Sequence, residues 1–315
     1  MPRRNYLWFY LISIMAFLIS LPIWASAEAV GNFTKVEQRV DYQQGQTGPV
    51  IPAKVKQPVE VNDVIHTYEV SRAQVLFRDQ TTITIAPKSK VAVESYMFDP
   101  AKFERSGRFD LIQGVMKVVV PASESLQKSS FEIKTSTATM GIRGTEFVVI
   151  SGTNFSVVYT MTGRVCIKSN PKEPGKYSVV QVAPGEVLEK GVVCLDPGTM
   201  SVILANQPPS SPQPATAAVM AAAEALVTTG INEVPGTCVL STLPGVNLLN
   251  VTNDLMSQGA NLDDVKESLG LVCYALPDTY AYGTEAPATP APTFPGLGAS
   301  GGGGGGGGGV ASPSI

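Results

Sequence analysis

Residues 136–150 read STATMGIRGTEFVVI and place two glycines around an arginine, in a stretch that otherwise has the composition of β-strands. Upstream, residues 131–135 read FEIKT, and the end of the run is rich in the β-branched and aromatic residues that suit a pleated sheet. Glycine within a strand pattern usually marks a bulge or a close approach of two backbones. Gly141 and Gly144 therefore predict a sharp kink in which Arg143 has a fixed direction.

Arg143 has two possible roles in such a kink. Its guanidinium could bind a ligand, or it could pair inside the domain with a carboxylate and with backbone carbonyls. An arginine between two glycines of a β kink more often has the second role, so we expect Arg143 to be buried and structural.

The quoted run resembles the signature of the FecR domain, a bacterial envelope module named after a regulator of iron-siderophore uptake. Residues 62–67 (NDVIHT) resemble its GD-x-I-x-T element, and residues 73–87 resemble its central hairpin. Asn62 and Gln80 depart from the family pattern, because each stands where glycine is usual. The resemblance covers residues 30–150 and implies an all-β domain with structural signature residues. These are Gly141, Arg143, Gly144, Thr145 and Phe147.

The composition limits both the size of the folded part and its chemistry. The chain has 315 residues and a net charge of −3, and its 30 glycines and 24 prolines are concentrated toward the C-terminus. It has room for one medium β domain, a smaller unit and long unpacked segments. Four cysteines and one histidine argue against a Cys/His zinc cluster or a common His-dependent triad. We expect no catalytic residue, no metal site, no cofactor and no binding to nucleic acid.

The first 27 residues have the pattern of a signal peptide. A short basic region precedes an uncharged apolar run over residues 7–24, and Ala-Ser-Ala follows at residues 25–27. We expect cleavage after Ala27, only transient contact with the membrane, and export to the periplasm or the extracellular space of a Gram-negative bacterium. The alternative is an uncleaved anchor, because an apolar run of this length could also span a bilayer.

Residues 28–206 have the pattern of an all-β domain. Short apolar or alternating segments are separated by glycines and prolines, which is typical of a sandwich, a barrel or a solenoid. Spacing alone does not decide between these topologies. We expect separate strands at residues 109–112 and 115–120. We also expect a hairpin at Gly163 and a later strand at residues 178–182.

The pattern changes after the β region. Proline-rich residues 207–214 predict a linker that lies in neither sheet nor helix. Residues 215–276 then predict a small helical unit. Its expected helices cover residues 215–229, residues 246–258 and a segment from Asn261 toward Cys273. Residues 277–315 are rich in alanine, proline and glycine and include nine consecutive glycines, so we expect a disordered tail.

The four cysteines fall into two pairs separated by the proline-rich segment. An exported chain reaches a compartment that permits oxidation, so we expect one disulfide in each unit. These would join Cys166 to Cys194 and Cys238 to Cys273. The sequence leaves three connectivities possible.

His66 and residues 96–105 could each have either a functional or a purely structural role. His66 could act as a pH switch, but we expect a half-buried residue beside a strand. The aromatic and charged run over residues 96–105 could bind a partner, but we expect a simple hairpin.

The leading hypothesis is a non-enzymatic, exported FecR-like module that binds another envelope protein, a glycan or a small signal. In the regulators that name the family, a cytoplasmic segment precedes a membrane span and acts on a sigma factor. Only residues 1–6 precede the apolar run here, so we expect no direct anti-sigma activity. The alternative is a structural surface or matrix protein whose flexible Gly-rich tail presents the β domain.

Overall fold

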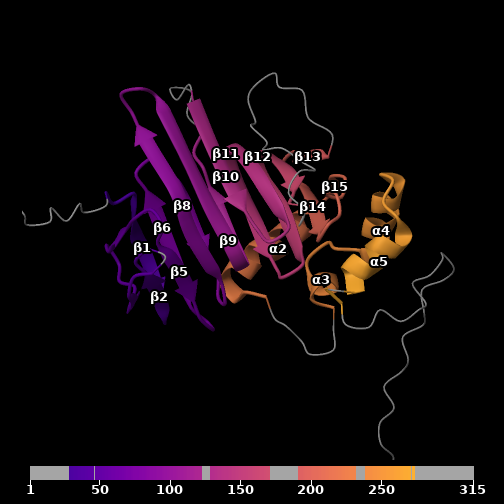
Figure 1. The fold of residues 1–315 in the computed structure, drawn as a ribbon, viewed down its shortest axis with the longest axis horizontal. Helices are drawn as coiled ribbons and strands as arrows, with labels where there is room; N and C mark the ends of the chain where they lie inside the picture. The colour runs from indigo at the N-terminus through magenta and orange to yellow at the C-terminus, as the bar shows by residue number, and fades with distance from the viewer. Residues whose placement is uncertain are drawn as a thin grey trace, which may run out of the picture. The chain divides into compact units, whose positions relative to one another are not determined.

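The computed structural model describes residues 28–45, 47–122, 128–170, 191–231, 238–270 and 272–273 (Figure 1). The predictions for the signal peptide at residues 1–27, the strand at residues 178–182 and the tail at residues 277–315 fall outside this part of the chain.

The described residues form a mainly β fold, as the sequence predicts, with fifteen strands paired into one sheet and four helices after them. The strands are β1 (Gly31–Glu37), β2 (Val40–Gln43), β3 (Val50–Pro52), β4 (Pro58–Val59), β5 (Val64–Thr67), β6 (Arg72–Phe77), β7 (Thr82–Ile85), β8 (Lys90–Asp99), β9 (Glu104–Val119), β10 (Lys128–Lys134), β11 (Ala138–Ser151), β12 (Phe155–Ser169), β13 (Val192–Leu195), β14 (Thr199–Leu204) and β15 (Gln213–Pro214). The helices are α2 (Ala217–Thr229), α3 (Val239–Thr242), α4 (Leu248–Ser257) and α5 (Leu262–Gly270).

The long strands β8 to β12 build the centre of the sheet (Figure 1). β10 lies between β9 and β11 over one half of their length, parallel to β9 and antiparallel to β11. Over the other half β9 and β11 pair directly, from Gly114 opposite Ser151 to Val119 opposite Glu146. β11 therefore changes its partner part-way along, between Ile142 and Glu146.

Two glycines that were expected to end strands lie inside long strands. Residues 109–120 do not form two strands, because β9 continues through Gly114. The hairpin expected at Gly163 is also absent, because β12 runs continuously through it. Gly114 has a φ of 102° and Gly163 a φ of 73°. Glycine reaches this left-handed region without a Cβ penalty, so each strand bends and continues.

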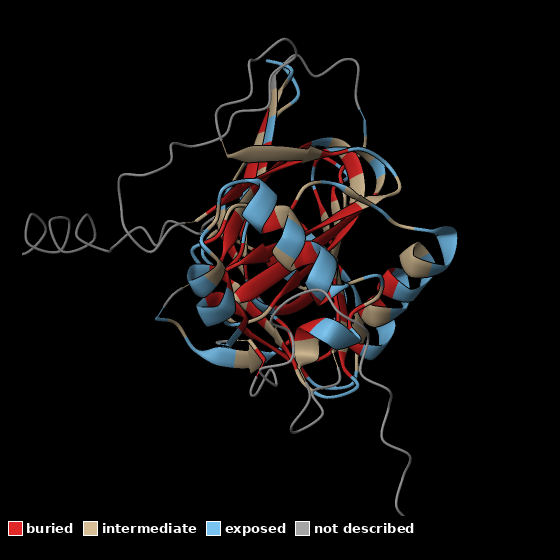
Figure 2. Cartoon of the chain, turned by 90° about the vertical axis from the view of Figure 1, so that its right-hand side faces the viewer, coloured by how far each residue is buried: buried red, intermediate tan, exposed pale blue. Residues whose placement is uncertain are grey.

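β11 and β12 are buried on both faces. Along β11, Phe147 and Val149 belong to a first core, which lies on the inner face of the sheet. Val148 and Ile150 alternate with them and belong to a second core on the outer face, together with Tyr159 of β12. The second core also contains buried residues of the helices, and Figure 2 shows these helices in front of buried strands. The helical residues include Ala223, Val227, Leu240, Val251, Leu255 and Val265.

Helices α2, α4 and α5 lie within the ranges predicted from the sequence, although α2 and α4 begin two residues later and α5 ends at Gly270. α2 begins after Thr216, whose hydroxyl accepts a hydrogen bond from the Val219 amide, and it ends at Gly230 with a φ of 71°. The first turn of α5 carries Asp263 and Asp264, where carboxylates interact favourably with the helix dipole. The short α3 was not expected from the sequence.

Specific polar contacts join the helical segment to the sheet. The Tyr159 hydroxyl donates a hydrogen bond to the Pro244 carbonyl oxygen at 2.7 Å. Lys117 of β9 forms ion pairs with Glu224 of α2 and, at 2.7 Å, with Glu146 of β11. The described residues of sheet and helices thus lie in one compact unit, Met1–Pro277.

Residues 207–214 were expected to be a linker outside any sheet, and the structure differs at their end. Gln213 and Pro214 form β15, in which Pro214 lies opposite Thr199 of β14. Proline is tolerated there because β15 has β14 as its one neighbour in the sheet order. No helix in the described ranges has both the length and the apolar character that crossing a membrane requires.

Candidate functional site around the signature run

The kink predicted at the signature run is a bulge shared by β11 and β12. Arg143 lies opposite Arg164, and the register of the two strands shifts before Glu146. Gly144 has a φ of 60° and faces Gly163, which is also in the left-handed region. A Cβ on Gly163 would collide with the Gly144 carbonyl oxygen, so the close approach of the two strands requires glycine there.

Arg143 is exposed, so the prediction of a buried Arg143 is wrong. Met140 and Ile142 on either side belong to the first core, and side chains alternate along a strand, so Arg143 lies on the outer face of the sheet. The Arg143 side chain forms no hydrogen bond or ion pair with any residue in the described ranges.

The other signature residues are largely enclosed. Gly141 pairs with Glu132 of β10 on one side and with Cys166 of β12 on the other. Phe147 is fully buried in the first core. Thr145 is 1% exposed, and its hydroxyl has no hydrogen-bond partner in the described part of the chain. Burial of this kind supports the structural role that the sequence predicts for these three residues.

The buried arginine of this region is Arg105 of β9, which is only 3% exposed. It donates hydrogen bonds to Ser129 Oγ at 2.9 Å, to the Asp79 carboxylate at 3.2 Å and to the Pro121 carbonyl oxygen at 2.7 Å. The guanidinium carbon also lies 5.4 Å from the centre of the Phe131 ring. Arg105 therefore has the contacts that were predicted for Arg143.

Asp79 is the acidic centre of the same cluster. Its side chain is fully buried and accepts hydrogen bonds from the Tyr96 hydroxyl at 2.9 Å and from the Thr81 hydroxyl at 2.6 Å. Burial raises the pKa of Tyr96, and the neighbouring Asp79 charge raises it further, so the phenol keeps the proton that it donates. Burial lowers the pKa of Arg105, against the opposing effect of Asp79. The cluster joins the β6–β7 turn to β8, β9 and β10.

Replacing Arg143 by alanine should leave the stability of the fold nearly unchanged. The side chain is exposed and has no hydrogen-bonding partner in the described ranges, and surface substitutions of this kind usually change the free energy of unfolding by less than about 0.5 kcal/mol. Thermal unfolding of R143A and of the wild type measures the difference. A loss of several degrees would mean that Arg143 has a structural role after all.

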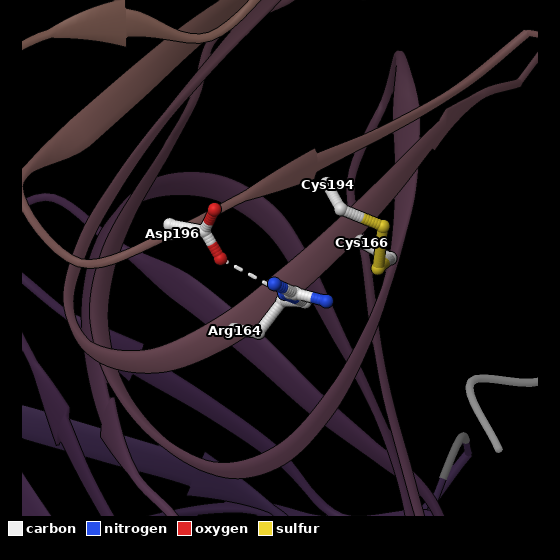
Figure 3. Close-up of a disulfide and its surroundings, with 4 residues drawn as sticks. All are labelled: Arg164, Cys166, Cys194 and Asp196. Carbon is white, nitrogen blue, oxygen red and sulfur yellow. Dashed lines mark hydrogen bonds and ion pairs between the residues drawn. A yellow bond between two sulfur atoms is a disulfide. The ribbon is translucent and has the colours of Figure 1, made fainter. Parts of the chain in front are cut away.

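The two predicted disulfides are present. Cys166 and Cys194 lie directly opposite each other on β12 and β13. Two residues from Cys166 on β12, Arg164 contacts Asp196, which follows β13, at 2.9 Å (Figure 3). Cys238 before α3 joins Cys273 after α5. No cysteine is free, and no group of histidine, cysteine or acidic residues in the described ranges could hold a metal ion.

His66 is half-buried in β5, as expected, with its ring 4.3 Å from that of Tyr68. Burial lowers its pKa, and the Lys90 charge lowers it further, while Asp41 has the opposite effect. The folded protein therefore favours the neutral imidazole.

We expect the signal of this single histidine to titrate in NMR with a midpoint below the ordinary value of about 6.5. Because the folded pKa is the lower one, the contribution of His66 to stability is present above about pH 6.5 and is lost as the pH falls through the folded pKa. As the pH falls below about 6.5, the variant H66Q should lose less stability than the wild type. A midpoint above 6.5 would contradict the prediction.

A comparison with known protein families agrees with the signature run. The model of the family described as FecR protein matches residues 63–166, a range that starts at Asp63 and ends at Cys166. The predicted resemblance to the FecR domain is confirmed. The match begins later than the expected residue 30 and extends past residue 150 into β12. We call residues 63–166 the FecR-like region.

Two crystal structures described as those of "a putative anti-sigma factor from Parabacteroides distasonis ATCC 8503" are similar to the chain at 16% identity with a TM-score of 0.35. The alignments cover 50% of this chain and 63% and 62% of those chains, so this chain spans less than two thirds of the length of those proteins. No curated protein matches the sequence significantly.

The pair of Arg105 and Asp79 was missed in the sequence, although one signal points to Arg105. Phe109 and Leu111 face the first core, and Arg105 lies at the same two-residue period. A cation at an inward position of a strand requires a buried partner. The position of Asp79, directly after β6, gives no indication of that partnership.

Proposed function

We propose that this protein is exported and serves as a non-enzymatic binding or signalling module of the cell envelope, built on its FecR-like region. The match to the FecR protein family over residues 63–166 is the observation that carries the proposal. Its partner is another envelope protein or a glycan.

The disulfides support export. Cys166–Cys194 and Cys238–Cys273 bring together residues 28 and 35 positions apart in the sequence. Structural disulfides form and persist in oxidising compartments such as the periplasm and the extracellular space, and they are rare in the bacterial cytoplasm. The apolar run before Ala27 supplies a route to such a compartment.

The outer face of the sheet offers a surface for binding. The helices cover the part of this face that contains Val148, Ile150 and Tyr159, but Arg143 beyond the bulge is exposed. Arg108 and Lys134 have side chains that are each 47% exposed on β9 and β10 of the same face. The signature run thus lies at the boundary between the covered and the exposed parts.

N-terminal sequencing of the native protein should give Glu28 as the first residue, with the protein recovered from a periplasmic extract or the culture supernatant. Cleavage is expected because Ala25 and Ala27 follow an uncharged apolar run. A start at Met1 or Pro2 in the membrane fraction would contradict export by cleavage. Recovery from the cell surface or an extracellular matrix would instead favour the alternative, a structural protein with a Gly-rich tail.

A further inference from the structure

The exposed part of the outer face carries charged residues on adjacent strands. The β9–β10 register places Arg108 opposite Glu132, and the β11–β12 register places Arg143 opposite Arg164. The alternate positions of these strands face inward and are buried, as Phe109, Ile133 and Val165 show in the first core. The members of this charged face include Glu94, Arg108, Asp110, Glu132, Lys134, Arg143, Arg164 and Asp196.

Arg143 differs from the other cations of this face because it has no partner in the described ranges. Arg108 contacts Glu132 at 2.8 Å, and Lys134 contacts Glu94 at 3.5 Å. Among the described residues, Arg143 is therefore a cation of this face with no carboxylate in contact.

Arg143 is also repelled by a second cation, Arg164. It lies directly opposite Arg164, and like charges opposite each other on neighbouring strands destabilise a sheet. The charge of Arg143 also acts on the buried Arg105 and lowers its pKa. An anion bound between Arg143 and Arg164 would relieve this repulsion.

The two arginines lie on a backbone that the fold restrains. The bulge at Gly144 and Gly163 sets the direction of both strands beside them. The Cys166–Cys194 disulfide lies close to the contact of Arg164 with Asp196 (Figure 3), and Val165 opposite Leu195 is the pair between them. Nε of Arg164 donates the hydrogen bond to Asp196, and the terminal nitrogens of Arg164 form no hydrogen bond with another residue in the described part of the chain.

We propose that Arg143 and Arg164 together bind a carboxylate side chain on an extended segment of a protein partner. The proposal rests on the binding function proposed above and names the chemistry of its partner. The planar guanidinium group matches the two oxygens of a carboxylate, and arginine often binds carboxylates through two parallel hydrogen bonds.

The same face argues against an acidic polysaccharide as the partner. Glu132 on β10 lies diagonally next to Arg143, and Asp196 contacts Arg164, so each arginine has a carboxylate nearby that would repel a chain of closely spaced anions. A peptide segment can instead present one carboxylate between neutral residues. Charge complementarity therefore selects a single acidic side chain.

Panning of a library of short random peptides on the full-length, mature protein tests this site, with the variants R143Q and R164Q beside it. The control is R108Q, which removes an arginine of equal charge from the same face but away from the proposed site. We expect wild type and R108Q to select peptides with one Asp or Glu at a fixed position. A synthetic peptide of that sequence should bind R143Q and R164Q roughly tenfold more weakly than it binds the wild type. Changing its acid to the amide should weaken binding to the wild type equally.

The outcomes of this experiment distinguish a failure of the two-arginine site from a failure of the proposed binding function. Selection of peptides without an acidic preference, or of acidic peptides that bind R143Q as well as the wild type, would overturn the two-arginine site and leave the binding function standing. If the wild type is retained on dextran sulfate but selects no acidic peptides, the proposed carboxylate site is wrong and a polyanionic glycan is the favoured ligand. Failure of the wild type to select any peptide or bind dextran sulfate would count against the binding function as well. Thermal unfolding of each variant confirms that it is folded.

Discussion

Replacing Arg105 by alanine should lower the free energy of unfolding by about 3 to 5 kcal/mol. The substitution leaves the Asp79 carboxylate, whose side chain is fully buried, without its cationic partner. It also removes the hydrogen bonds to Ser129 and to the Pro121 carbonyl oxygen. Such a loss is a large share of the roughly 5 to 15 kcal/mol that stabilises a typical domain. Denaturant titration at neutral pH measures it.

Arg78 supplies a matched control on the turn next to Asp79. Its side chain is 44% exposed and pairs with the exposed Glu28, so R78A should cost less than about 1 kcal/mol. The double variant R105M/D79N should recover part of the stability that R105M loses, because no uncompensated charge is left buried. The role assigned to Arg105 is wrong if R105A and R78A unfold at the same denaturant concentration.

A chain that ends at residue 214 should associate or lose its fold. Without the helices, the apolar side chains on the outer face of β11, β12 and β14 would be exposed. These are Val148, Ile150, Val157, Tyr159, Val202 and Leu204. Exposing a buried side chain of this size costs roughly 1.5 to 3 kcal/mol, and an exposed patch of several such residues promotes association. Size-exclusion chromatography with light scattering should show aggregates or little soluble protein.

A chain that ends at Pro277 is the matched control, because the compact unit extends to that residue. It should have the same oligomeric state as the full-length protein and unfold at the same temperature. A soluble, monomeric chain ending at residue 214 with unchanged unfolding would show that the helical segment at residues 215–276 is a separate unit, as its sequence suggests.

The parts of the structure that were predictable depend on local patterns. Gly230 and Gly259 follow the ends of α2 and α4 because glycine reaches the left-handed region, with φ values of 71° and 91°. Gly141 and Gly144 predicted an irregular strand for a related reason. However, Gly114 and Gly163 were taken for turns between strands, since a bulge and a turn can use the same left-handed φ.

The face of the sheet on which the Arg143 side chain lies could not be predicted, because it depends on where the bulge shifts the alternation of side chains along β11. A shift of one residue moves a side chain to the other face of a sheet. Met140 and Ile142 face the first core, so Arg143 does not. The partnership of Arg105 with Asp79 spans 26 residues, and β7, which follows Asp79, pairs with β9 at the end of that strand opposite to Arg105. Nothing local to either residue specifies it.

The disulfides also determine how the chain would carry a mechanical load. A pull along the backbone passes through the sulfur atoms, so the residues between Cys166 and Cys194, and those between Cys238 and Cys273, bear no tension. With separations of 28 and 35 residues, these loops would withhold about 100 Å and about 120 Å of extended chain. In a single-molecule pulling experiment, the oxidised protein should therefore stop lengthening about 220 Å earlier than the reduced protein. Under tension, the chain would be held short by its cystines even after its strands had separated.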